Sequence, residues 1–202
     1  ERVNKDPVDP EKIEQVALAV ASYERQYVGE LKVPNAADWI RNKVEVRREP
    51  AVVWVDHQNV ADALDDVLSN MTIDGKPVRY AMINGKNNNT PKKKGEIVAK
   101  FQSGAIDVIV GSQSMAEGVT LTRANEALFV EYWWMPGKLT QAQDRIYRVG
   151  QKEDVLISTL HAPGTIDDKM RQKLGQEDAS LEEGTAAGGC AQSIAEARRA
   201  GD

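Results

Sequence analysis

The sequence contains very few of the residues that bind metals or form disulfides. Its 202 residues include one cysteine, Cys190, and two histidines, His57 and His161. A single cysteine excludes an internal disulfide, and so small a set excludes a Cys/His zinc site, so we expect no metal-ligating residues in this chain. Such sparse cysteine is typical of a reducing compartment, and we expect a cytoplasmic location.

Long apolar runs are also missing. No stretch approaches the roughly 20 apolar residues of a membrane-spanning helix, and no signal peptide opens the chain, so we expect no membrane partner. The first residue is Glu1 rather than Met, which leads us to expect a piece of a longer protein.

The two common glycine-rich phosphate-binding motifs are absent. Neither G-x-x-x-x-G-K-[ST] nor G-x-G-x-x-G occurs, and Gly85-Lys86 is an isolated pair. If the protein handles a nucleotide, another module must hold the phosphates of that nucleotide.

Acidic residues outnumber basic ones, 31 to 26, for a net charge of −5. This balance argues against a simple nucleic-acid clamp. The basic residues are concentrated, however, in residues 85–100 and 138–152, whereas residues 176–202 are acidic. The sequence is therefore compatible with one basic face on an acidic protein.

Short apolar runs alternate with helical patterns through the middle of the chain. The five runs, rich in Val and Ile, are 51–55, 78–83, 106–111, 126–132 and 155–161. Helical spacing is found at 59–70, 90–102, 138–150 and 165–175, in the opening segment and at 37–46. This alternation predicts an α/β fold, a parallel sheet with helices on both faces.

Ligands of such sheets bind beyond the carboxyl ends of the strands. The segments predicted there include 56–58, 84–86, 112–114 and 133–136, which carry polar or aromatic side chains but could equally be plain connections. We interpret His57 as a hydrogen-bonding loop residue. Of the adjacent Trp133 and Trp134, at least one is expected in the core.

The most specific segment is QAQDRIYRVGQ, residues 141–151. Arg145 and Arg148 are three residues apart on a predicted helix and would share one face. Two neighbouring guanidinium groups repel unless an anion lies beside them, and a triphosphate would supply that anion. The alternative is a solvated helix on which Asp144 is the local partner of the arginines.

This segment resembles the last conserved motif of the Swi/Snf-type ATPases, a branch of the superfamily-two helicases and DNA translocases. Five other stretches resemble motifs of that family in the same order, namely 51–64, 83–85, 112–121, 134–136 and 164–168. Together the six stretches extend over most of the chain.

The resemblance implies a RecA-like lobe without its own P-loop, the C-terminal lobe of an ATP-dependent DNA translocase or helicase. It divides the chain into a helical connector at 1–48, the lobe at 49–176 and a flexible Ala/Gly-rich acidic tail at 177–202, with a helix at 192–199. ATP and Mg would be held mainly by a separate N-terminal lobe, so this chain alone would be inactive. The first 30 residues are equally consistent with a plain packing helix.

The resemblance also implies roles for individual residues. Arg148 and Arg145 would be catalytic arginine fingers, which neutralise charge on the transferred phosphoryl group. The residues implied at the ATP cleft are Gln141, Gln151, Gly118 and Asp144. The residues implied at the DNA backbone, where contacts position a protein without reading sequence, are Gln58, Ser112, Thr120, Lys86 and Lys94.

The chain departs from the family pattern at several positions. Its 112–121 loop is one residue shorter than the usual form, Thr120 and Met135 replace asparagines, and Lys94 replaces an arginine. No large insertion separates the strands, which favours a bacterial or phage-type translocase over a chromatin remodeller. The alternative function is a non-catalytic RecA-like module that docks DNA or protein.

Overall fold

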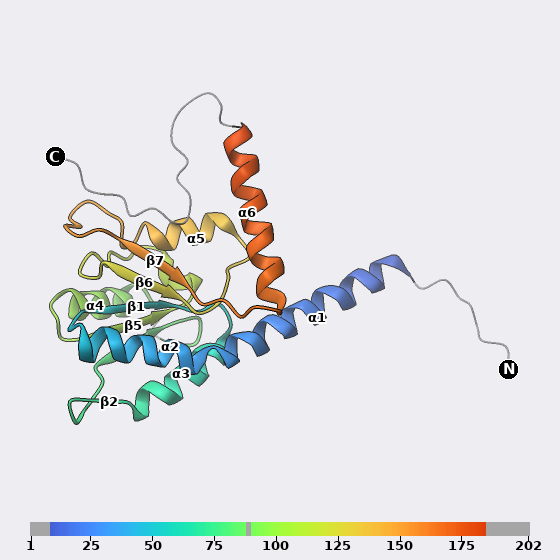
Figure 1. The fold of residues 1–202 in the computed structure, drawn as a ribbon. Coiled ribbons are helices and arrows are strands. Elements are labelled where there is room, and N and C mark those ends of the chain that lie inside the picture. The colour runs from blue at the N-terminus through green and yellow to red at the C-terminus, as the bar shows by residue number, and fades with distance from the viewer. Residues whose placement is uncertain (1–8, 88–89, 185–202) are drawn as a thin grey trace.

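The centre of the protein is a parallel sheet of five strands. The computed structural model describes residues 9–87 and 90–184 (Figure 1). The strands are β1 Ala51–Trp54, β4 Tyr80–Ile83, β5 Val108–Gly111, β6 Glu126–Phe129 and β7 Leu156–Thr159. Their order is β4-β5-β1-β6-β7, and every neighbouring pair is parallel. The predicted α/β fold is confirmed, with strands shorter than the apolar runs.

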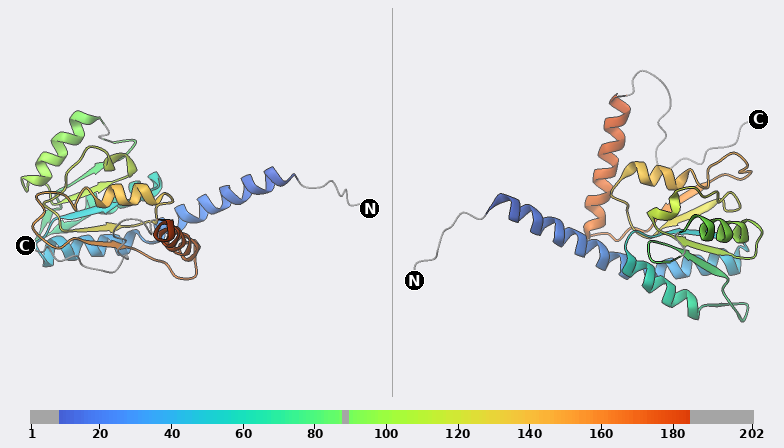
Figure 2. Two further views of the ribbon diagram at one scale, coloured as in Figure 1. Left: turned by 90° about the horizontal axis from the view of Figure 1, so that it is seen from above. Right: turned by 180° about the vertical axis from the view of Figure 1, so that it is seen from behind.

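Helices cover both faces of this sheet, as expected (Figure 2). They are α1 Pro10–Leu31, α2 Val33–Arg41, α3 Gln58–Asn70, α4 Pro91–Gln102, α5 Pro136–Gln143 and α6 Ile166–Gly184. The face that carries Val53 packs against α2 and α3, and the face that carries Val52 packs against α4 and α5. Because successive strand residues point to opposite faces, a sheet buried on both sides requires continuous apolar runs.

Two short helical turns and a hairpin complete the described chain. They are the π-helical η1 Asn42–Val46, the 3-10 helical η2 Gln113–Ala116, and the hairpin of β2 Thr72–Ile73 with β3 Lys76–Pro77. The apolar pattern does not predict this hairpin, which turns at Asp74 and Gly75, both with positive φ. Within the described ranges, no helix is both long and apolar enough to cross a membrane.

A buried ion pair joins η1 to the amino-terminal edge of the sheet. Lys43, only 1% exposed, donates to Glu126 at 2.6 Å, and Arg47 donates to the same oxygen at 2.6 Å. Burial raises the pKa of Glu126, but the two cations outweigh burial, and the net pKa lies below its ordinary value. The buried charge is therefore matched by opposite charge, without which it would be strongly destabilising.

Helix α1 is anchored to the body of the molecule at one end only (Figures 1 and 2). Near its C-terminus Val28 packs with Ile166 and Met170 of α6. Its N-terminal half extends beyond the sheet. Gly29 allows close approach to the body, because a Cβ there would lie 2.7 Å from a methyl group of Val60.

Two helix boundaries differ from the expected ones. Helix α2 begins at Val33 rather than at residue 37, with Pro34 in its first turn, where the missing N–H of proline has no helical partner to lose. Helix α6 continues to Gly184, past the expected start of the tail. The rest of that tail, with the helix expected at 192–199, lies outside the described residues.

A pair of glycine substitutions tests the packing of α1. Gly29→Ala should lower the free energy of unfolding by about 1–3 kcal/mol, because the new methyl group meets Val60 and the Glu131 carboxylate. Gly95→Ala in α4 is the matched control, since a Cβ there has nothing within 4 Å, and it should stabilise by up to about 1 kcal/mol. Urea unfolding measures both changes. Equal stability of the two variants would contradict the tight fit at Gly29.

Candidate functional site

Two segments that are distant in sequence meet beyond the carboxyl ends of the strands. Residues 112–121 follow β5 and residues 136–151 follow β6, and we call them the paired loops. The Leu121 N–H donates to the Arg145 carbonyl at 2.8 Å. Gly118, which the sequence analysis places at the ATP cleft, has a φ of +75°, a conformation that favours glycine.

The helix expected at 138–150 is wrong in its C-terminal part. Helix α5 ends at Gln143, and the chain continues as a series of turns. Arg145 and Arg148 therefore do not share a helix face. One cause is tertiary, because Leu121 of the other loop takes the carbonyl of Arg145. A second feature is local, because Gly150 has a φ of +104°.

The apolar residues of this segment have helical spacing because they are buried against the sheet. Ala142 and Ile146 are both fully buried against the sheet and are four residues apart, which is the spacing of one helix face. The same spacing is compatible with a helix end followed by tight turns, so the apolar pattern alone did not distinguish the two.

The two arginines have different partners. Arg148 is exposed, and its guanidinium donates to the Thr120 hydroxyl at 2.8 Å. Arg145 is half-buried, and its Nε donates to the carbonyl of Gln141 at 3.1 Å within its own loop. The structure thus brings Arg148 together with Thr120 across the paired loops and directs Arg145 back along its own segment.

Of the two glutamines expected at the ATP cleft, Gln151 organises these loops. The amide of Gln151 donates to the Ala124 carbonyl at 2.7 Å, and its oxygen accepts from two backbone N–H groups, those of Lys152 and Glu153. The side-chain oxygen of Gln141 is buried and has no hydrogen-bond partner among the described residues. Asp144 is exposed at the end of α5.

The residues expected to contact DNA fall into separate groups. Lys94 donates to the Ser114 carbonyl, and the Ser112 hydroxyl lies 3.0 Å from the Ser114 hydroxyl, so this group gathers beyond β5. Thr120 belongs instead with Arg148, as described above.

Gln58 and Lys86 form another group around Asp62. Gln58, in the first turn of α3, donates to Asp62 at 2.8 Å, and the Lys86 ammonium lies 3.3 Å from the same carboxylate. The hydrogen bond from Gln58 and then the interactions with Lys86 hold the pKa of Asp62 below its ordinary value. Both side chains are therefore held near the carboxyl end of β4.

The sequence analysis places Asn84 at a strand end but assigns it no role. It is 2% exposed at the end of β4, and its oxygen accepts from the backbone N–H groups of Lys86 and Asn87. Its Nδ2 is buried and lacks a partner in the part of the chain that the structure describes. Its position directly after an apolar run is the sequence feature that indicates a strand end.

The sequence analysis missed the buried Glu131. Glu131 accepts from the backbone N–H groups of Asp56 and His57 at 2.8 and 3.0 Å, and its other oxygen lies 2.6 Å from His57 Nδ1. This contact confirms the interpretation of His57 as a hydrogen-bonding residue.

The two adjacent tryptophans have different environments, which confirms the expectation for this pair. Trp133 is fully buried, with its ring centroid 5.6 Å from that of Trp54 in an edge-to-face contact. Trp134 is 42% exposed, and the Lys173 ammonium lies 4.1 Å from its ring centroid.

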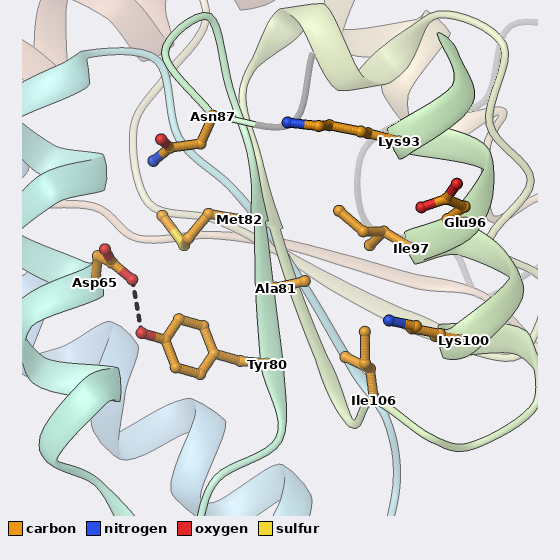
Figure 3. Close-up of a pocket in the computed structure, with 10 residues that line it drawn as sticks. All are labelled: Asp65, Tyr80, Ala81, Met82, Asn87, Lys93, Glu96, Ile97, Lys100 and Ile106. Atoms are coloured by element: carbon orange, nitrogen blue, oxygen red, sulfur yellow. Dashed lines mark hydrogen bonds between the residues drawn. The ribbon is translucent and has the colours of Figure 1, made fainter. Parts of the chain in front are cut away.

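A cavity of about 630 Å³ lies away from the paired loops, beside the edge strand β4 (Figure 3). It is lined by Met82 of β4 and by Lys93 and Ile97 of α4, among others, and by none of the predicted site residues. Tyr80 donates to Asp65 at 2.7 Å, and burial followed by Asp65 raises the pKa of Tyr80 to about 12.

Comparison with known proteins identifies the class. A family model described as the helicase conserved C-terminal domain matches residues 36–150. The chain belongs to this family. The crystal structure of the C-terminal part of the Fun30 ATPase domain matches with a TM-score of 0.62 at 23% identity, over 70% of this chain and 44% of that one, which shows the common fold.

The relatives specify the branch of the family. The chain is 33% identical over 161 residues to "SWI/SNF-related matrix-associated actin-dependent regulator of chromatin subfamily A-like protein 1" of Xenopus tropicalis, covering 79% of this chain and 16% of that protein. It is 30% identical over 136 residues to "DNA annealing helicase and endonuclease ZRANB3" of Homo sapiens, covering 66% and 12%. The chain is therefore a C-terminal RecA-like lobe of SWI/SNF type and spans about a sixth of the first relative.

Removal of the Gln151 side chain tests how the paired loops are held. Gln151→Ala should lower the free energy of unfolding by about 1–3 kcal/mol, because the Ala124 carbonyl and two backbone N–H groups lose their partner. Gln172→Ala, on the exposed surface of α6, should change it by less than about 0.5 kcal/mol. If urea unfolding finds the two variants equally stable, Gln151 does not organise the loops.

Proposed function

We propose that this chain is the second lobe of an ATP-dependent DNA translocase and that Arg148 reaches the phosphates of ATP bound on an N-terminal lobe. The observation that carries the proposal is the exposed guanidinium of Arg148, held by Thr120 at the carboxyl edge of a helicase-type sheet. A guanidinium is always charged and forms paired hydrogen bonds with phosphate oxygens. Supplied from a second lobe, it stabilises negative charge that develops during phosphoryl transfer.

Arg145 has a different part in this proposal. Its Nε is engaged with the Gln141 carbonyl, so a second finger at this position requires the end of α5 to rearrange. Gln141, Gln151, Gly118 and Asp144 belong to the same loops, and we assign them to the ATP-facing surface. ATP and Mg would be held mainly by the N-terminal lobe, because this sequence has no P-loop.

Contact with the DNA backbone is assigned to the strand ends of β1, β4 and β5. Lys94 with Ser112, and Lys86 with Gln58, supply ammonium, hydroxyl and amide groups, which are the usual partners of phosphate oxygens. Thr120 joins this surface to Arg148. These contacts are independent of base sequence and should weaken as salt rises.

The N-terminal ATPase lobe is the protein partner that this function requires. Residues 1–48 would connect the two lobes, with α1 as the connecting helix. The single cysteine of the sequence supports the cytoplasmic location that we propose.

Substitution of Arg148 in the whole protein that contains this lobe is the central test. Arg148→Ala should reduce DNA-stimulated ATP hydrolysis by about 10³–10⁵-fold, because the charge on the transferred phosphoryl group loses its partner. ATP binding should stay within about threefold of wild type, because the N-terminal lobe supplies most of its free energy. Arg79→Ala, at the opposite edge of the sheet where Arg79 pairs with Asp107, should leave hydrolysis unchanged. A near-wild-type rate for Arg148→Ala would refute the finger and favour a docking module.

The isolated chain gives a second test. It should release no phosphate from ATP above the buffer blank, with or without DNA, because the residues that hold the triphosphate are on the other lobe. A colorimetric phosphate assay on the purified chain measures this. Robust turnover would show that the chain is not half of a composite site.

A further inference from the structure

Helix α1 is bonded directly to the strand ends that carry the site. The guanidinium of Arg25 donates to Asp56 beyond β1 at 2.6 Å and to the Tyr132 carbonyl beyond β6 at 3.0 Å. The side chains of Arg25 and Asp56 are 15% and 14% exposed. Removal of one partner from a charge-assisted pair so shielded from water costs more than removal of one partner from a surface salt bridge.

Asp56 also binds the 112–121 loop, the first of the paired loops. Its second oxygen accepts from the Gln113 amide at 2.9 Å. Gln113 is the first residue of η2, which opens the 112–121 loop. The two oxygens of one carboxylate therefore hold α1 on one side and this loop on the other.

The loop continues from Gln113 to the proposed finger. Met115 N–H donates to the Ser112 carbonyl at 2.8 Å, which closes the turn of η2. At the far end of the loop Thr120 holds Arg148, and Leu121 holds the carbonyl of Arg145. The path from α1 to Arg148 thus has hydrogen bonds at both ends of the loop, and residues 116–119 join those ends through the backbone.

Two further contacts keep α1 from moving independently of this edge. Lys32, directly after α1, is 6% exposed and donates to Asp167 at 2.9 Å and to the Leu160 carbonyl beyond β7 at 3.2 Å. Gly29 lies against the Glu131 carboxylate that accepts from Asp56 N–H. The C-terminal part of α1 therefore has one orientation relative to the strand ends.

We infer that Arg25 is a positioning residue that couples the orientation of α1 to the conformation of the 112–121 loop and, through Thr120, to Arg148. The inference rests on the proposed function for its consequence in catalysis, but the coupling itself is a property of this chain. The N-terminal half of α1 extends beyond the sheet (Figure 2). We therefore expect a displacement of that half to reach the carboxylate of Asp56 through Arg25.

Hydrogen exchange on this chain tests the coupling without ATP. In Arg25→Ala, the Met115 and Leu121 amides should exchange about tenfold faster relative to the amides of β1, the change expected when a hydrogen bond to a charged group is lost. Arg25→Lys, which keeps a donor for Asp56, should restore most of the protection. Arg47→Ala breaks an ion pair at the opposite edge and should leave the ratio unchanged.

Gln113→Ala keeps the test decisive if Arg25→Ala does not fold. It leaves the pair of Arg25 with Asp56 intact and removes only the link to the loop, so it should give the same selective acceleration at Leu121. Unchanged exchange at Met115 and Leu121 in Gln113→Ala would overturn the coupling.

Steady-state kinetics of the whole protein separate this inference from the proposed function. Arg25→Ala and Gln113→Ala should each lower DNA-stimulated kcat by about tenfold with an unchanged KM for ATP, while Arg47→Ala stays at the wild-type rate. An active whole protein whose kcat is insensitive to both variants would overturn the coupling and leave the function standing. A whole protein without ATPase activity would overturn the function, and the exchange ratio would then decide the coupling alone.

Discussion

Parallel pairing of β1 with both β5 and β6 is the constraint on which the rest of this lobe depends. A central strand paired on both sides is covered by helices on both faces, and β1 is accordingly fully buried. Because the strands are parallel, their carboxyl ends lie at the same edge of the sheet, and so do the residues that follow them. Asp56, Asn84, Ser112 and Glu131 lie along one edge of the sheet for this reason.

The two edges of the sheet differ in how their charges are matched. At the amino-terminal edge, Lys43 and Arg47 meet Glu126 in a closed network that ties η1 to β6. At the carboxyl edge, Arg148 is exposed, and buried polar atoms of Asn84 and Gln141 lack partners within the described residues. Unmatched polar atoms are costly in a core, and the Nε1 atoms of the core residues Trp54 and Trp133 also lack partners among the described residues. The exposed guanidinium of Arg148 is therefore the feature that supports the carboxyl edge as the working edge.

The helicase-type motifs contact one another at that edge through hydrogen bonds. The last motif packs on the 112–121 loop through Arg148 and Leu121, and the carboxylate of Asp56 ties that loop to α1. Each of these segments supplies a hydrogen-bond partner of the next. The same arrangement explains why α1, which lies outside the sheet, forms an ion pair with Asp56 at the end of β1.

Apolar runs and helical spacing were sufficient to predict the five strands, the burial of β1, β5 and β6 on both faces, and most of the helices, since these depend on which residues must leave water along each segment. They were not sufficient for residues 144–150. The buried residues Ala142 and Ile146 have the spacing of a helix face, but the Arg145 carbonyl, which a longer helix would use, accepts from the Leu121 N–H instead. Nor could the apolar pattern show that Arg148 binds Thr120, that Gln58 and Lys86 share Asp62, or that Arg25 meets Asp56. Periodicity is a local property of the chain. Which donor pairs with which acceptor in distant segments depends on the tertiary fold, because only the sheet brings those segments to one edge.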